Sequence, residues 1–158
     1  MLSVPHPASF KKALLSSRQA LSSYYIYLFQ FARLPEWWMT RRGGRGFARA
    51  LSGHTRERAM RDVRAMIDTG TLTPALNWYR AMPATFVGPE LGPVAAPTLM
   101  IWSDGDVIVK EDGIRTTGRH VAGDYRLEIM RGVTHWIADE CPDRLAELRA
   151  DWFAAHDD

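Results

Sequence analysis

Two short strand-like runs beyond Pro97 constrain the fold of this chain more than any other feature. The first runs from Thr98 to Ser103 and the second from Tyr125 to Met130, and both suit strands of a sheet. A short helix is expected between Lys110 and Val121, and an amphipathic helix follows from Pro142 to about Ala155. Strand, helix, strand and helix in this order predict a parallel βαβα unit, and therefore an α/β fold class.

The chain before about Met82 has a different, almost entirely helical pattern. Proline and hydroxyl residues mark the helix starts, because proline fits the first helical turn and a hydroxyl caps its free N–H groups. A Gly- and Pro-rich hinge from Pro83 to Pro97 separates this region from the strands. The expected helices run from Ala8 to about Gln19, from Ser22 or Ser23 through Tyr24, Tyr25, Tyr27, Phe29 and Phe31, from Pro35 through Trp37 and Trp38, from Thr55 to about Asp68, and from Thr73 to about Pro83.

Composition and charge indicate an ordinary globular protein. The 158 residues are 46% apolar and 24% charged, and the formal net charge of +2 favours neither a nucleic-acid nor a membrane partner. The stretch from Arg41 to Gly46 resembles an RNA-binding Arg/Gly box, but it is short and single, so we interpret it as a solvated loop. Cys141 is the only cysteine, which suits a reducing compartment. Without a signal-peptide pattern or a membrane-length apolar stretch, we expect a cytoplasmic protein.

An acid and a base follow the two predicted strands. Asp106 comes just after the first strand and His135 just after the second, so both lie where parallel strands present side chains at one edge of a sheet. A carboxylate there can orient one imidazole nitrogen and leave the other to take a proton from water. Alternatives remain open: Asp104 competes with Asp106 for the role of the acid, either Asp can serve only as a turn former, and His135 can be a satisfied buried side chain.

Other catalytic patterns are missing from the sequence. No nucleophile elbow of the G-x-S-x-G type occurs, and no Gly-rich phosphate loop is present. The histidines are scattered without metal-ligand spacing, so we expect neither a metal nor a cofactor. These histidines are His6, His54, His120, His135 and His156.

Six segments carry a resemblance to a known family and cover nearly the whole chain in that family's order. The chain resembles the cap and C-terminal half of an α/β-hydrolase of the epoxide hydrolase branch, which implies a partial α/β-hydrolase fold. The resemblance implies that residues 1–20 follow the nucleophile-bearing half, that 21–90 form the helical cap, and that 91–158 complete the core. The matching segments are Ser3–Pro7, Ser23–Gln30, Leu34–Glu36, Ala75–Arg80, Trp102–Asp106 and Gly132–Trp136.

The resemblance also implies residue roles. Asp106 maps to the catalytic acid, His135 to the base, and Tyr25 and Tyr79 to the cap tyrosines that hydrogen-bond the epoxide oxygen. Phenol donors aimed at that oxygen stabilise the alkoxide charge of ring opening more than the neutral epoxide. Without the resemblance, core packing explains either tyrosine better than substrate binding does, and Tyr24 and Tyr27 compete with Tyr25. Four tryptophans are expected to line an apolar substrate pocket or to pack beneath it: Trp37, Trp38, Trp78 and Trp136.

The family's nucleophile and oxyanion segment have no counterpart in these 158 residues. Loss of a triad nucleophile costs on the order of a million-fold in turnover, so we expect a fragment that is inactive alone. Its expected partners are a small apolar epoxide, if the site is completed, and a second copy or a complementing N-terminal half that covers exposed strand edges. Two alternatives stay open: another lid-bearing hydrolase, such as a haloacid dehalogenase or an esterase, and a non-catalytic truncated remnant or interaction module.

Overall fold

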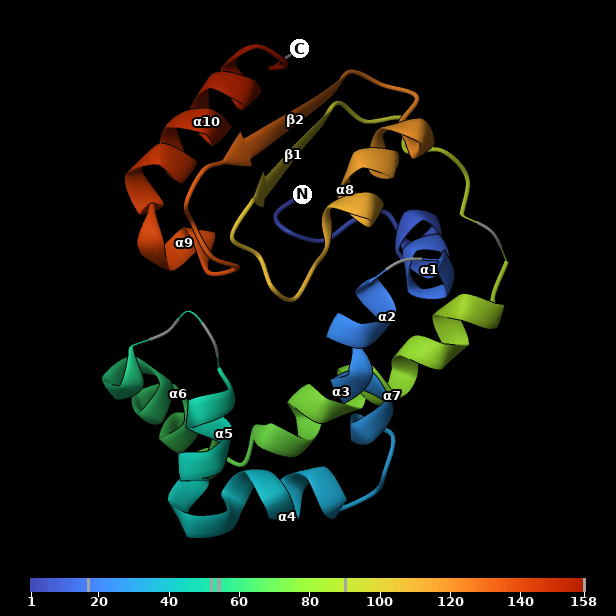
Figure 1. Cartoon of the computed structure of the whole chain (residues 1–158). Coiled ribbons are helices and arrows are strands. Elements are labelled where there is room, and N and C mark those ends of the chain that lie inside the picture. Colours follow the sequence, from blue (N-terminus) through green and yellow to red (C-terminus); the bar gives the residue numbers. More distant parts are fainter. Residues whose placement is uncertain (17, 52, 54, 90, 158) are drawn as a thin grey trace. The chain divides into compact units, whose positions relative to one another are not determined.

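A computed structural model describes residues 1–16, 18–51, 53, 55–89 and 91–157 (Figure 1). His54, counted above among the scattered histidines, and Glu90, in the expected hinge, lie outside the described residues. The chain divides into two compact units. We call Met1–Ser22 together with Pro89–Asp158 the strand unit, and Ser23–Gly88 the helical unit.

The strand unit is built on a parallel pair of strands. β1 (Thr98–Ser103) and β2 (Tyr125–Met130) confirm the predicted strand bounds, and they pair in register from Thr98 with Tyr125 to Ser103 with Met130. The first residues of the chain bind the other edge of β1: the Ser3 N–H donates to the Ile101 carbonyl at 2.8 Å, and the Ile101 N–H donates to the Met1 carbonyl at 2.9 Å. β1 therefore has backbone partners on both sides, and all six of its residues are buried.

Helices cover both faces of this strand pair. Successive β1 side chains point to opposite faces, so Leu99 and Ile101 pack with α10 (Pro142–Ala154), whereas Met100 and Trp102 pack with α8 (Glu111–Thr117). Figure 1 shows α10 on one side of the strands and α8 on the other. The remaining elements of this unit are α1 (Pro7–Ser16), α2 (Gln19–Ser22), η2 (Gly118–His120) and α9 (Ile137–Glu140).

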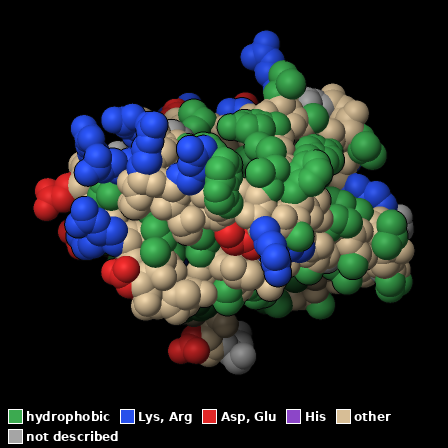
Figure 2. Space-filling view, turned by 90° about the horizontal axis from the view of Figure 1, so that it is seen from below, with side chains coloured by type: hydrophobic (Ala, Val, Ile, Leu, Met, Phe, Trp, Pro, Cys, Tyr) green, Lys and Arg blue, Asp and Glu red, His purple; other side chains and the backbone are tan. Residues whose placement is uncertain are grey.

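The helical unit contains short helices around two small apolar clusters. Met39, Leu72 and Leu76 form one cluster, and the other contains Ala48, Ala59 and Val63. Large apolar side chains nevertheless stay exposed, including Tyr24, Tyr27, Phe31, Trp37, Trp38 and Trp78. Figure 2 shows apolar side chains gathered beside basic ones on one face. The elements are α3 (Tyr24–Phe29), α4 (Leu34–Thr40), η1 (Arg41–Gly44), α5 (Arg45–Ala50), α6 (Arg56–Asp68) and α7 (Leu72–Val87).

The expectation that the last of these helices ends near Pro83 is wrong. α7 continues through Pro83 to Val87. Proline cannot donate to the carbonyl four residues earlier, which here belongs to Tyr79. The Gln30 side-chain amide donates to that carbonyl instead, at 2.8 Å, so the bond lost to proline is replaced from a neighbouring helix.

The interpretation of Arg41–Gly46 as a solvated loop is only half correct, because most of the stretch is exposed but it is helical. This stretch forms η1 and the start of α5. Gly44 has a left-handed φ of 77°, and a Cβ placed there would lie 2.3 Å from the Val63 side chain. The glycine is therefore required by close packing of η1 on α6, which sequence composition does not reveal.

Other helix limits differ in smaller ways. The first expected helix is split into α1 and α2, α3 ends at Phe29 before Phe31, and α9 was not predicted. The predicted cap of α6 is confirmed, because the Thr55 hydroxyl accepts the Arg58 N–H at 3.3 Å. Among the described residues, no helix is both long and apolar enough to cross a membrane.

Candidate active site

The loops after β1 and β2 are joined by backbone hydrogen bonds. The Asp104 N–H donates to the Met130 carbonyl at 3.2 Å, and the Gly105 N–H donates to the Val133 carbonyl at 3.1 Å. A Cβ on Gly105 would lie 2.5 Å from that same carbonyl oxygen. Only glycine allows this approach without displacement, and it brings the residue that follows, Asp106, against the loop that carries His135.

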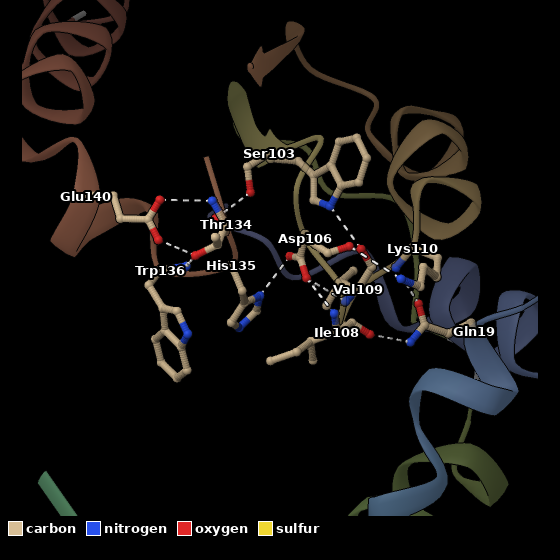
Figure 3. Close-up of polar contacts among 11 residues, drawn as sticks. Gln19, Ser103, Asp106, Ile108, Val109, Lys110, Thr134, His135, Trp136 and Glu140 are labelled. Atoms are coloured by element: carbon tan, nitrogen blue, oxygen red, sulfur yellow. Dashed lines mark hydrogen bonds and ion pairs between the residues drawn. The ribbon is translucent and has the colours of Figure 1, made fainter. Parts of the chain in front are cut away.

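Asp106 is a buried carboxylate with a partner for each oxygen. Its side chain is 0% exposed, and its Oδ1 accepts the N–H groups of Ile108 and Val109, both at 2.8 Å. Its Oδ2 lies 2.7 Å from Nδ1 of His135 (Figure 3). Because the two backbone groups can only donate, Oδ1 is an acceptor here, and Oδ2 is left to contact the imidazole.

His135 is held by one nitrogen and open at the other. Its Nδ1 is the atom that contacts Asp106, so the proton of a neutral imidazole is favoured on Nδ1 and a lone pair is left on Nε2. The side chain is 23% exposed, and Nε2 makes no hydrogen bond within the described part of the chain. This arrangement can remove a proton from a bound water and share the resulting imidazolium charge with a buried carboxylate.

Asp104, the competing candidate for the acid, is a turn former. Its Oδ1 accepts the Gly132 N–H at 2.7 Å, and its Oδ2 lies 3.3 Å from the Arg131 guanidinium. Gly132 has a φ of 70°, so the turn that places its N–H there uses the left-handed region that glycine tolerates. Asp104 thus ties the two loops together while Asp106 contacts the imidazole.

The structure reveals a contact beside His135 that sequence reasoning missed. The Glu140 carboxylate accepts the Thr134 N–H at 3.0 Å and also the Thr134 hydroxyl. The Ser103 hydroxyl donates to the Thr134 carbonyl at 2.7 Å, so the residue before His135 is held by both its N–H and its C=O group. Glu140 lies on α9, whose existence was not predicted, and no local pattern marks it.

Tyr25 and Tyr79 come together inside the helical unit. Their ring centroids are 5.7 Å apart in an edge-on arrangement, and Phe29 contacts both rings. Burial raises the pKa of the Tyr79 phenol above its ordinary value, so the group stays a protonated donor at neutral pH. The competing Tyr24 and Tyr27 are both 63% exposed, which leaves Tyr25 as the partner of Tyr79.

The four predicted pocket tryptophans occupy different settings. Trp136 lies edge-on to the His135 ring with centroids 5.3 Å apart. Trp37 is stacked under the Arg41 guanidinium at 4.3 Å, and Trp38 and Trp78 are exposed. Only Trp136 is therefore brought to the acid–base pair within its own unit. No group of three side chains suited to a metal ion occurs among the described residues.

Comparison with known proteins finds relatives over nearly the whole chain. No protein-family model matches it. Epoxide hydrolase 3 of Xenopus tropicalis is 26% identical over 96% of the chain, and epoxide hydrolase 2 of Caenorhabditis elegans is 28% identical over 88%. The chain covers 44% and 42% of those two proteins, so it spans less than half the length of either relative.

A solved structure shares the fold. The crystal structure of Bacillus megaterium epoxide hydrolase with an inhibitor matches 95% of the chain with a TM-score of 0.78 and 16% sequence identity. The match covers 58% of that protein. The architecture is therefore a partial α/β-hydrolase fold, as the sequence predicted.

Proposed function

We propose that this chain carries the acid–base pair and the lid donors for converting an epoxide to a diol. The premise is that the chain is an epoxide hydrolase-like homologue in the α/β-hydrolase superfamily. In this proposal the helical unit is the cap and the strand unit is the C-terminal part of the core. The observation that carries the proposal is the hydrogen bond from buried Asp106 to His135, which leaves Nε2 open.

The first step would open the epoxide. A carboxylate, proposed to come from a complementing N-terminal half, attacks an epoxide carbon, and the carbon–oxygen bond of the ring breaks. The phenol groups of Tyr25 and Tyr79 hydrogen-bond the departing oxygen, and one of them gives it a proton. Two observations support this role: the two rings lie 5.7 Å apart between centroids, and the raised pKa of Tyr79 keeps that phenol protonated at neutral pH.

The second step would release the diol. His135 Nε2 takes a proton from water, and the hydroxide attacks the carbonyl carbon of the covalent ester. The ester bond breaks, and the carboxylic acid that forms gives its proton to the leaving alkoxide, so the diol leaves and the carboxylate is regenerated. The proton held by the imidazolium then returns through solvent to the tyrosinate left by the first step, which restores both groups. Asp106 stabilises the imidazolium and fixes the ring orientation through Nδ1, which is the function of the acid in hydrolytic triads.

A reconstitution assay tests this proposal. Styrene oxide is supplied to the chain alone and to the chain mixed with a separately produced N-terminal half of an epoxide hydrolase. We expect diol only from the mixture. Absence of diol from a mixture that co-elutes as a folded complex on size-exclusion chromatography would refute the proposal. Ester and haloacid substrates in parallel distinguish the alternative hydrolase chemistries.

Variants separate the two steps in the same mixture. His135→Gln should leave alkylation intact while hydrolysis falls by about 100- to 10,000-fold, because only the second step needs the base. Mass spectrometry would then detect the accumulated ester. Tyr79→Phe should slow alkylation by about 100-fold or more, whereas Tyr27→Phe, at an exposed phenol, should leave it unchanged. Equal effects of both tyrosine variants would contradict the assigned donor.

A further inference from the structure

We infer that Gln19 is the positioning residue for the acid–base pair. Gln19 lies on α2 and is 1% exposed. It acts on the loop that holds Asp106. The inference rests on the proposed role of that pair and adds a residue to it that sequence reasoning did not select.

The Gln19 amide binds the loop with both of its polar atoms. Its Nε2 donates to the Ile108 carbonyl at 2.8 Å, and its Oε1 accepts the Lys110 N–H at 2.7 Å. These two backbone groups flank Val109, so the side chain pairs with the loop as a neighbouring strand would. Figure 3 shows Gln19 reaching from its helix to this loop.

The same short loop supplies the donors to Asp106. The N–H groups of Ile108 and Val109 bind Asp106 Oδ1, and the Val109 carbonyl accepts the Trp102 indole N–H at 3.0 Å. Gln19 and Trp102 thus fix the peptide groups from 108 to 110, and those groups fix the carboxylate. Trp102 belongs to β1 and holds one carbonyl, whereas Gln19 holds both ends of the segment.

Loss of the Gln19 amide would leave the partly buried Ile108 carbonyl and Lys110 N–H without this partner. Unpaired buried polar groups are costly, so the loop is expected to turn toward other partners and withdraw its N–H groups from Asp106. The carboxylate would then lose its fixed orientation toward His135 Nδ1. Gln19 lies on α2, the last helix of the strand unit before Ser23, so the contact with the loop is made within one unit.

The test measures the His135 Nδ1 proton directly in the intact chain labelled with ¹⁵N-histidine. In the unchanged protein, the hydrogen bond to Asp106 protects this proton from exchange with water. Gln19→Met removes both amide contacts and should speed the exchange at least about tenfold, equivalent to about 1.4 kcal/mol. Gln19→Glu retains an acceptor for the Lys110 N–H but loses the donor to Ile108, and should have an intermediate effect.

Gln30→Met is the matched control, because Gln30 also donates to backbone carbonyls but within the helical unit. It should leave the His135 signal unchanged. Unchanged exchange in both Gln19 variants would overturn the inference. So would a general loss of native signals from His6, His120 and His156 in those variants, because Gln19 would then support the whole fold. The measurement needs no substrate, so a positive result beside failed diol formation would reject the proposed function alone.

Discussion

At the scale of single residues, the two carboxylate oxygens of Asp106 have different functions. One oxygen accepts backbone N–H groups and the other contacts the imidazole. The residue is therefore both a structural acceptor in its loop and the group that orients His135. These two functions can be separated, because an amide retains one acceptor oxygen and replaces the other with a donor.

We expect the Asp106→Asn variant to fold with little loss of stability. His135 should nevertheless lose its ability to act as a base. The amide oxygen can still accept from Ile108 and Val109, but its NH₂ group would face His135 Nδ1 and force that nitrogen to be an acceptor. The imidazole proton would move to Nε2. Nitrogen chemical shifts of His135 would report this change of tautomer, and an unchanged tautomer would contradict the orientation assigned to Asp106.

Gly105 provides a prediction about backbone approach. Gly105→Ala should lower the free energy of unfolding by about 1–3 kcal/mol, because its Cβ would lie 2.5 Å from the Val133 carbonyl. Gly92→Ala is the control, since nothing lies within 4 Å of a Cβ at that position. Urea denaturation measures both variants. An equal change in the free energy of unfolding for both variants would show that the close approach of the two loops does not require glycine at position 105.

At the scale of elements, Arg80 joins three helices of the helical unit. From α7, its guanidinium donates to the carbonyls of Phe29 and Phe31 at the end of α3, and it lies 2.8 Å from the Glu36 carboxylate on α4. It follows Tyr79 directly in the chain. The residue that neighbours the proposed lid donor is therefore also the one that fixes α7 against the helix carrying Tyr25.

We expect Arg80→Lys to lower the free energy of unfolding by about 1–3 kcal/mol, because an ammonium group cannot reach all of these acceptors. Arg61→Lys, at a 68% exposed side chain paired with neighbouring Asp62, should change it by less than about 0.5 kcal/mol. Chemical denaturation measures the difference. Tyrosine ring signals in NMR would show whether the Tyr25–Tyr79 contact also loosens in the Arg80→Lys variant.

The elements also show where sequence patterns are sufficient. The bounds of β1 and β2 follow from short strand-like runs, and the α6 cap follows from a hydroxyl before an apolar stripe at helical spacing. The end of α7 was predicted wrongly at Pro83, because the hydrogen bond that proline cannot make is replaced by one from Gln30, which is distant in sequence. A local breaker signal is reliable only where no neighbouring element can satisfy the freed group.

At the scale of the whole molecule, His6 makes the stability of the folded state depend on pH. It is buried, its Nδ1 accepts the Ala8 N–H at 3.3 Å, and its ring stacks on His120 with centroids 4.4 Å apart. Burial, and then the charge of His120, lower the pKa of His6 below its usual value. The unfolded chain therefore binds this proton at a higher pH than the folded chain does.

We expect the stability contributed by His6 to be complete above pH about 6.5 and to decline as the pH falls from there toward the lowered pKa of the folded state. His6→Asn keeps an acceptor for the Ala8 N–H but cannot titrate. The free energy of unfolding, measured by urea at pH 7.5 and 5.5, should fall more in the unchanged protein than in this variant. Equal pH dependence in the two proteins would show that His6 does not contribute to the pH dependence of stability.

The sequence by itself determined the strand positions, the α/β class and the residue types at the two strand ends. Each of these depends on a local pattern: apolar runs, helix caps, and an acid or base just beyond a strand. Parallel pairing alone then brings Asp106 and His135 to one edge, so their contact was predictable.

Only the tertiary structure decided which groups hold that pair in place. Gln19, Glu140 and the Gly44 packing contact leave no local signal, because each is defined by a partner on another element. Buried polar groups must find partners wherever the packed chain provides them. Such partners can be far apart in sequence, so local sequence patterns do not identify them. The positions of the acid and the base come from short-range preference, and their orientation comes from long-range packing.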